Sequence, residues 1–191
     1  MQKSTPVVIK YKSVELSLNS VKLKVYETGI IFHKPDNKWI KVKVYTNSRG
    51  YDQCRIAGKQ YVVHRIVYKA FNQQWDITDV SRSNYIDHID HNRVNNRLSN
   101  LRVATQSENL CNTGARKTSR TGLKDISPWY NPANRHWYWA VHVSTKGICT
   151  RRVFRVDTGY PPDVLPDVPQ HIIDERDKII QKMHGEFACL D

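Results

Sequence analysis

Cysteine and long apolar runs are both scarce in this chain of 191 residues. The four cysteines lie far apart and form no C-x-x-C pair, so neither a thiolate zinc knuckle nor a disulfide framework is indicated. No run approaches the roughly 18 apolar residues of a membrane span, and the N-terminal stretch MQKSTPVVIKYK lacks the apolar core of a signal peptide. These absences predict an intracellular protein with free thiols and no membrane partner.

Acidic residues are also in short supply: 30 Lys and Arg stand against 18 Asp and Glu, a formal net charge of +12. The basic residues are scattered along the chain rather than gathered in a tail, which favours a polyanionic partner. Charge alone does not separate DNA from RNA or an anionic membrane, and a basic solvated surface without a partner stays open. The 39% hydrophobic content is enough for one domain or two small ones.

The first sixty residues alternate apolar and other residues in the runs VKLKVYETGIIFH, KWIKVKVY and YDQCRIAGKQYVVH. Turn residues separate the runs, so the period of two predicts antiparallel hairpins. In KWIKVKVY, Lys41 and Lys43 fall on one face of the predicted strand, opposite Ile40, Val42 and Val44. This cationic face is a candidate for contacts with DNA phosphates, and an ordinary charged solvent face explains it equally well.

The period changes to helical spacing in HRIVYKAF, from His64, which predicts a short helix. Residues 85–112 then indicate a small unit of two strands and a helix, at YIDHI, NLRVA and TQSENLCN. The helix begins with Thr105 followed three residues later by Glu108, the pattern of a capping box. A unit this small must lean on the hairpins, bind an ion, or both.

The stretches VHRIVYKAF and DHIDHNRVNNRLSNLRVATQSEN resemble the HNH endonucleases of bacteriophages and group I introns. The resemblance runs from Val63 to Asn109 and rests on the combined spacing of the Asp-His pair, NNR, NLR and the helix-borne SEN. It implies a ββα-metal fold that hydrolyses a phosphodiester bond of double-stranded DNA. That chemistry needs an activated water and a cation on the phosphate.

The resemblance also implies the roles of four residues. Asp87 and Asn109 would supply oxygens to one Mg²⁺ or Mn²⁺ ion, which keeps water ligands that a substrate can replace. His88 would be the general base. Asn100, twelve residues further on, would accept the imidazole N–H and so fix the tautomer.

Other residues of this segment carry weaker expectations. Arg93 and Arg97 are placed near DNA phosphate, while Asn95 and Asn96 are expected to shape the loop. His64 matches a position of the family, and both a structural role and a phosphate contact stay open for it.

His91 departs from the family pattern, which commonly has glycine at this position. Histidine tolerates positive φ poorly, so the turn is expected to differ locally. His91 could touch substrate, add a metal ligand or face solvent. A zinc site built from both Asp-His pairs, residues 87–91, is the rival interpretation, and it leaves Asn100 and Asn109 without a role.

A basic, glycine-punctuated linker is predicted at residues 113–120, before a second domain at 121–191. GLKDISPWY, RHWYWAVHVSTKG and CTRRVFRV are predicted strands, and the following helix has an apolar stripe and a plausible stop at Gly185. Three strands and a helix ending in MHGEFA resemble the Apetala or ethylene-response-factor DNA-binding domain, in which the sheet lies in the major groove. Its tryptophans could instead be core residues of an ordinary small α+β domain.

This second resemblance implies that one face of the sheet binds DNA, while Trp137, Trp139, Val141 and Val143 face the helix. The candidate DNA-contacting residues are Lys124, Tyr138, His142, Arg151 and Arg155.

Together these patterns predict an α+β protein: hairpins and an HNH module in residues 1–112, then a three-stranded sheet packed on one helix. We expect a monomeric, metal-dependent, site-preferring endonuclease of the homing type without an organic cofactor. Two alternatives remain, a DNA-binding regulator with a vestigial nuclease site and an RNA-binding protein, although the HNH spacing does not favour the latter.

Overall fold

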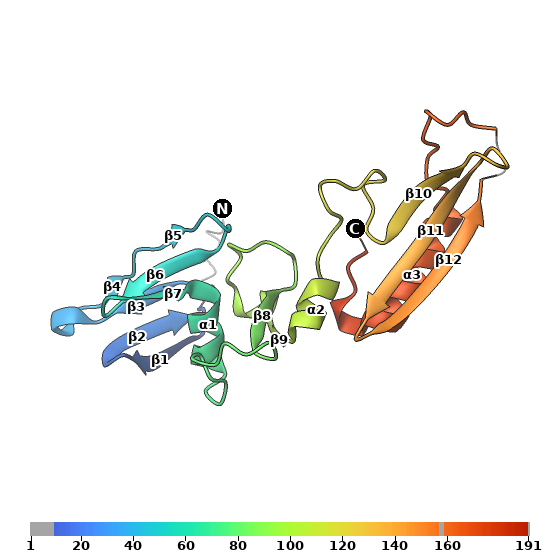
Figure 1. The fold of residues 1–191 in the computed structure, drawn as a ribbon. Coiled ribbons are helices and arrows are strands. Elements are labelled where there is room, and N and C mark those ends of the chain that lie inside the picture. Colours follow the sequence, from blue (N-terminus) through green and yellow to red (C-terminus); the bar gives the residue numbers. More distant parts are fainter. Residues whose placement is uncertain (1–9, 157–158, 191) are drawn as a thin grey trace, which may run out of the picture. The chain divides into compact units, whose positions relative to one another are not determined.

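The computed structural model describes residues 10–156 and 159–190 as a mixture of small antiparallel sheets and short helices (Figure 1). The first nine residues, where no signal segment is expected, lie outside this range. The chain divides into two compact units between Ala104 and Thr105. This division lies eight residues before the predicted boundary at 112 and assigns the last predicted helix of the HNH segment to the second unit.

The first unit contains three antiparallel sheets and one α-helix. The sheet strands and the helix are, in chain order, β1 (Ser13–Leu18), β2 (Val21–Tyr26), β3 (Ile31–His33), β4 (Ile40–Lys41), β5 (Tyr45–Thr46), β6 (Asp52–Ile56), β7 (Lys59–Val62), α1 (Val63–Phe71), β8 (Tyr85–His88) and β9 (Leu101–Ala104). The strands pair as β1-β2-β3-β4, β5-β6-β7 and β8-β9, and two 3₁₀ turns, Pro35–Asn37 and Leu98–Asn100, complete the unit. The predicted hairpins and helix are therefore confirmed.

The predicted strand over KWIKVKVY is wrong in one respect, because it is divided between two sheets. Lys41 ends β4, and the next strand, β5, pairs with β6 in another sheet. Val42 is buried between them and its N–H donates to Ile31 O, while Ile40 and Val44 are exposed. Lys43 lies outside both strands, so Lys41 and Lys43 do not share a strand face, although both are exposed.

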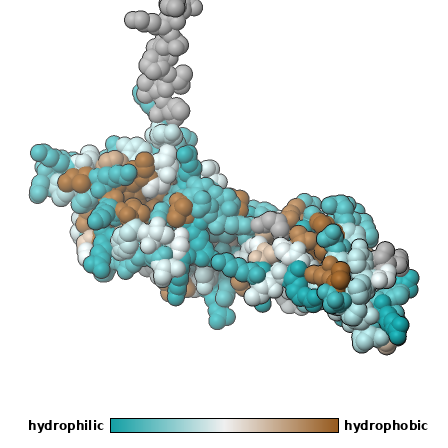
Figure 2. Space-filling model, turned by 90° about the horizontal axis from the view of Figure 1, so that it is seen from above, coloured by the Kyte–Doolittle hydropathy of each residue, from teal (hydrophilic) through white to brown (hydrophobic). Residues whose placement is uncertain are grey.

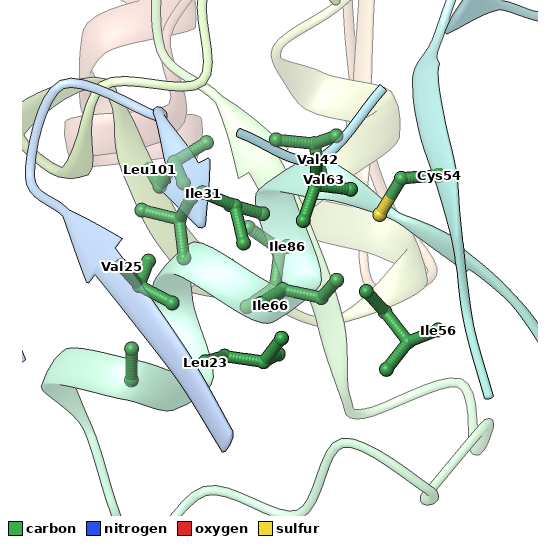
Figure 3. Close-up of a cluster of buried hydrophobic side chains, with 12 residues drawn as sticks. Leu23, Val25, Ile31, Val42, Cys54, Ile56, Val63, Ile66, Ile86 and Leu101 are labelled. Atoms are coloured by element: carbon green, nitrogen blue, oxygen red, sulfur yellow. The ribbon is translucent and has the colours of Figure 1, made fainter. Parts of the chain in front are cut away.

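One hydrophobic core joins the small sheets of the first unit. Figure 3 shows Leu23, Val25 and Ile31 of the first sheet around Ile66 of α1, with Ile86 of β8 nearby. Leu101 of β9 belongs to the same cluster. The β8–β9 pair thus leans on the hairpins and on α1, as the sequence predicts for a unit too small to form its own core.

The second unit begins with a short helix and continues with a sheet covered by a longer helix. Its elements are α2 (Gln106–Cys111), β10 (Ile126–Asn131), β11 (His136–Thr145), β12 (Ile148–Arg155), α3 (Gln170–His184) and a 3₁₀ turn, Gly185–Phe187. Trp139, Val141 and Val143 of β11 form a core with Ile172 and Ile180 of α3. The predicted packing of this face of β11 on the helix is confirmed for these three residues, whereas Trp137 is buried outside this cluster and its Nε1 donates to Pro161 O.

The end of α3 follows the predicted stop. Gly185 has φ +56°, in the left-handed region that glycine adopts without steric cost, and its N–H bonds Gln181 O. The strand order is β10-β11-β12, all antiparallel.

The surface seen in Figure 2 is mostly hydrophilic, with hydrophobic residues in small groups. Among the described residues, none of the helices is both long and apolar enough to cross a membrane.

Candidate active site

The two strands β8 and β9 carry a buried Asp-His pair. Asp87 stands opposite Arg102 and His88 opposite Leu101 in the strand register, and both Asp87 and His88 are only 5% exposed. Arg102 Nε donates to Asp87 Oδ2 at 2.9 Å. Burial is tolerated because the charge is paired.

His88 is packed among aromatic side chains from distant parts of the sequence. Its ring centroid lies 4.9 Å from that of His64 on α1, edge to face, and 6.0 Å from that of Tyr51. Burial lowers the pKa of His88 below the usual value, although the neighbouring Asn96 amide and two nearby carboxylates act in the opposite direction. The imidazole is therefore neutral near pH 7 and able to accept a proton.

His64 is buried to a similar degree. It is 6% exposed, and burial lowers its pKa to about 3, with His88 and Arg65 adding to the effect. Its Nδ1 is buried without a hydrogen-bond partner among the described residues. Such a position favours a structural role, next to His88, over the phosphate contact that the sequence left open.

The loop after β8 is organised around Asp90 rather than around the histidine. The Asp90 carboxylate accepts from Asn100 Nδ2 at 2.7 Å, from Asn95 Nδ2 at 2.6 Å and from Asn92 N at 2.9 Å. Burial raises the pKa of Asp90, but these hydrogen bonds outweigh it and the net pKa is lowered. The asparagines in this stretch therefore serve mainly to hold one turn, as predicted for Asn95.

The side chain of Asn100, which was predicted to accept from the His88 imidazole, bonds the loop after β8. Asn100 Oδ1 accepts from Asp90 N at 3.0 Å, and its Nδ2 donates to Asp90 and to Asn95 O. The amide beside the imidazole is instead that of Asn96.

Asn96 is fixed from several directions. Its Nδ2 donates to Asp52 Oδ2 at 3.0 Å and to Val94 O at 3.1 Å, and the side chain is 6% exposed. A Cβ placed on Gly29, which has φ +91°, would lie 3.1 Å from the Asn96 Cβ, so the hairpin turn at Gly29 packs directly against it. The amide that faces the imidazole is thus held by two separate hairpins.

His91 has a positive φ of +61°, a region that glycine adopts without steric cost, and its N–H bonds His88 O at 3.0 Å. The His91 side chain is exposed. Among the described residues, no group of three or more His, Cys, Asp or Glu could hold a metal ion, which argues against the rival zinc site at residues 87–91.

The two loop arginines differ in how they are held. Arg93 donates to Arg49 O at 2.8 Å, and its guanidinium lies 4.9 Å from the centre of the Tyr51 ring. It therefore borders the aromatic cluster around His88. Arg97 is exposed, as are Lys41 and Lys43.

Asn109 lies on α2, in the second unit. The predicted capping box is present: Thr105 Oγ1 accepts from Glu108 N, and Glu108 Oε2 accepts from Thr105 N and Oγ1. Lys124 Nζ donates to Cys111 O at 2.6 Å and to Leu110 O at 3.4 Å. Lys124, predicted to contact DNA, is thus found at the end of α2.

The face of the β10–β12 sheet opposite α3 is exposed and basic. Trp129, Tyr138 and Arg155 are in register across the three strands, as are His142 and Arg151 on the last two. The Trp129 and Tyr138 rings are stacked, with centroids 4.5 Å apart, and His142 Nε2 lies 2.8 Å from Cys149 Sγ. Ala140 lies between Tyr138 and His142 on the same face of β11, but it is buried. Four of the five candidate DNA-contacting residues therefore share this surface.

Residues 61–111 match the family model described as HNH endonuclease. A relative named an uncharacterized HNH endonuclease, from Acanthamoeba polyphaga mimivirus, is 35% identical over 94 residues, 48% of this chain and 47% of that protein. A putative HNH homing endonuclease of the SPbeta prophage in Bacillus subtilis is 33% identical over 88 residues, 44% of this chain and 48% of that protein.

The chain spans about half the length of these curated relatives. A solved structure described as "DNA binding and cleavage by the HNH homing endonuclease I-HmuI" aligns with 85% of this chain and 84% of its own, at 22% identity and a TM-score of 0.38. Nothing in these comparisons supports an Apetala-type domain after residue 111, and that assignment is not retained. A three-stranded sheet on one helix is a simple arrangement that the pattern of strands and helix alone can generate.

Sequence patterns did not identify three residues of the site. Arg102 pairs with Asp87, Tyr51 packs near His88, and the Asn96 amide lies beside the same ring. Arg102 belongs to the NLR motif and stands opposite Asp87 in the register of β8 and β9. A predicted hairpin register could therefore have indicated this ion pair. Tyr51 had no such signal, because its contact depends on the packing of a distant hairpin.

Proposed function

We propose that this protein is a metal-dependent, site-preferring DNA endonuclease that hydrolyses a phosphodiester bond as a monomer. The observation that carries the proposal is the buried Asp87–His88 pair inside the segment that matches the HNH endonucleases. Burying a carboxylate beside a neutral imidazole costs folding free energy. Buried ionisable groups with shifted pKa values cluster at functional sites.

His88 is the proposed general base that removes a proton from the attacking water. Its lowered pKa keeps the ring neutral at physiological pH, and Asn96 and the neighbouring rings of His64 and Tyr51 hold its orientation. Asn100 supports the same geometry indirectly, through Asp90 and the turn that follows β8.

Asp87 and Asn109 would hold one Mg²⁺ or Mn²⁺ ion, following the family resemblance. Their donor atoms fit a hard cation, because both supply oxygen. Asp87 already accepts from Arg102, and a carboxylate has about four lone-pair sites, so the ion pair leaves capacity for a metal. When bound, the ion would stabilise negative charge on the phosphate and on the departing oxygen.

Recognition of double-stranded DNA is proposed for the exposed basic surfaces. These are the open face of the β10–β12 sheet, with Tyr138, His142, Arg151 and Arg155, and the basic residues Arg93, Arg97, Lys41 and Lys43 of the first unit. Phosphate neutralisation would supply affinity, and base edges read by the sheet would supply preference.

A plasmid-cleavage assay with the full chain tests the proposal. We expect nicking or cutting in Mg²⁺ or Mn²⁺ and none in EDTA. EDTA should leave the circular dichroism spectrum unchanged, because so few protein ligands do not carry the fold. Binding of plasmid without cleavage in any divalent metal would instead identify a DNA-binding regulator with an inactive site, and stoichiometric zinc in the purified protein would reject the proposed cofactor.

A further inference from the structure

The helix that carries Asn109 is too short to be stable without contacts from neighbouring residues. α2 has six residues, Gln106–Cys111. Helices shorter than about 12 residues are marginal in water, so their stability comes from caps and tertiary contacts. What holds the two ends of α2 therefore decides how well Asn109 is placed.

The C-terminal end of α2 is held by one lysine of the second unit. Lys124 Nζ donates to Cys111 O, a carbonyl of the last turn, at 2.6 Å and at 3.4 Å to Leu110 O, which also accepts from Thr113 N and Oγ1. A cation at a helix C-terminus also interacts favourably with the helix dipole. Lys124 immediately precedes Asp125 and the sheet strand β10, so this contact fastens α2 to the sheet.

The N-terminal end of α2 is held by a second lysine of the same sheet. Lys146, in the turn between β11 and β12, donates from Nζ to Glu108 Oε1 at 3.2 Å. Glu108 is the residue whose other carboxylate oxygen closes the capping box with Thr105. Lys146 is 64% exposed, so its ion pair is the weaker of the two anchors. Thr145 adds a contact between its Oγ1 and Cys111 Sγ at 3.6 Å.

We propose that Lys124, supported by Lys146, is a positioning residue of the nuclease site, acting through α2 on Asn109. The inference rests on the proposed function, because it states that contacts from the β10–β12 sheet fix the position of Asn109, the proposed metal ligand. α2 lies within the segment that matches the HNH family model, but its contacts place it in the second unit, with the β10–β12 sheet. The C-terminal unit thus contributes to catalysis as well as to DNA binding, and Lys124 is an anchor rather than a phosphate contact.

Hydrogen exchange measured on the full-length protein, without metal or DNA, tests the anchor independently of activity. Lys124→Met removes a charged donor from two carbonyls, and we expect amides 109–113 to exchange roughly 5- to 10-fold faster. Lys124→Arg should restore slow exchange, because it keeps a cationic donor. Lys117→Met, which removes the same charge from an exposed position, is the control and should match the wild type. Unchanged exchange in Lys124→Met would overturn the proposal.

Cleavage rate as a function of Mg²⁺ concentration tests the consequence for the metal. Lys124→Met should need several-fold more Mg²⁺ for half-maximal cleavage, while its DNA affinity in EDTA stays equal to that of Lys117→Met. Lys146→Met should shift both readouts less, in the same direction. A loss of DNA affinity in EDTA with an unchanged Mg²⁺ requirement would make Lys124 a phosphate contact and reject the anchor. If the wild type does not cleave at all, the proposed function fails, and the exchange experiment still decides whether Lys124 holds α2.

Discussion

The β8–β9 pair and the open face of the β10–β12 sheet use polar residues in opposite ways. In the first region Asp87, His88 and Asn96 are almost fully buried, and other side chains fix each of them. On the second, Arg151 and Arg155 are exposed on a sheet whose other face packs against α3. Buried groups are costly but keep one geometry, while exposed ones are mobile and remain available to a large partner.

This difference separates chemistry from recognition in the proposed nuclease. Proton abstraction requires a base in one orientation with a controlled pKa, which the aromatic cluster around His88 provides. Phosphate binding requires accessible positive charge, and small displacements cost it little. Substitutions in the two regions should therefore affect different measured quantities.

The largest effect is expected for His88→Ala. Removal of a general base typically lowers the rate by about 10² to 10⁴-fold, and the site should keep its DNA affinity within a few-fold. Single-turnover cleavage and gel-shift binding measure the two quantities. His91→Ala, which alters an exposed residue three positions later, should keep substantial activity. An inactive His91→Ala beside an active His88→Ala would move the site along the chain.

The next effect is expected for Arg151→Ala combined with Arg155→Ala. If each arginine neutralises one phosphate, the slope of log affinity against log salt falls by about 1.8, and affinity falls roughly 60-fold at 0.1 M salt. The cleavage rate at saturating protein should stay near that of the wild type. A reduced rate at saturation with unchanged affinity would remove this sheet face from recognition.

A smaller effect is expected for Asn96→Ala. Loss of the amide that interacts with the imidazole should lower the cleavage rate by roughly 10-fold, as for other residues that orient a catalytic ring. Asn95→Ala is the matched control, because Asn95 bonds Asp90 instead of His88. Its rate should change less than that of Asn96→Ala. Equal losses in the two variants would mean that the loop acts as a unit and that the amide beside the ring has no separate role.

The smallest change concerns acid stability and His64. Its folded-state pKa of about 3 lies below the ordinary 6.5, so the unfolded chain binds the proton more tightly. The stability that His64 contributes is complete above pH 6.5 and is lost as the pH falls toward 3. Urea unfolding at pH 7.5, 6 and 5 should show a flatter pH profile for His64→Phe than for the wild type. Parallel profiles would show that His64 does not titrate differently on folding.

Features encoded by neighbouring residues could be predicted from the sequence. The capping box of α2 depends on Thr105 and Glu108, three positions apart, and the stop of α3 depends on one glycine. The alternation along β11 correctly separated Trp139, Val141 and Val143 from the opposite face. Each of these signals lies within one turn or one strand.

Features that depend on packing between distant segments could not be predicted in the same way. Nothing in the run of asparagines indicates that Asn96 faces His88 while Asn100 turns to Asp90, because both occur in a loop without a fixed period. The strand predicted at residues 38–45 also failed for this reason. Val42 is needed in the core, and burying it moves the chain from one sheet to the next.

The close approach of Gly29 to Asn96 limits how freely the nuclease segment can be transplanted. Residues 61–111 match a family model, yet two segments before residue 61 hold Asn96 in place. The hairpin turn at Gly29 packs against Asn96, and Asn96 Nδ2 donates to Asp52 on β6. Leu98 N also bonds Glu27 O beside that turn. The site therefore has a high contact order, and its geometry forms only after long loops have closed. A graft of residues 61–111 into another host should fold poorly unless the hairpins from residue 13 onward travel with it.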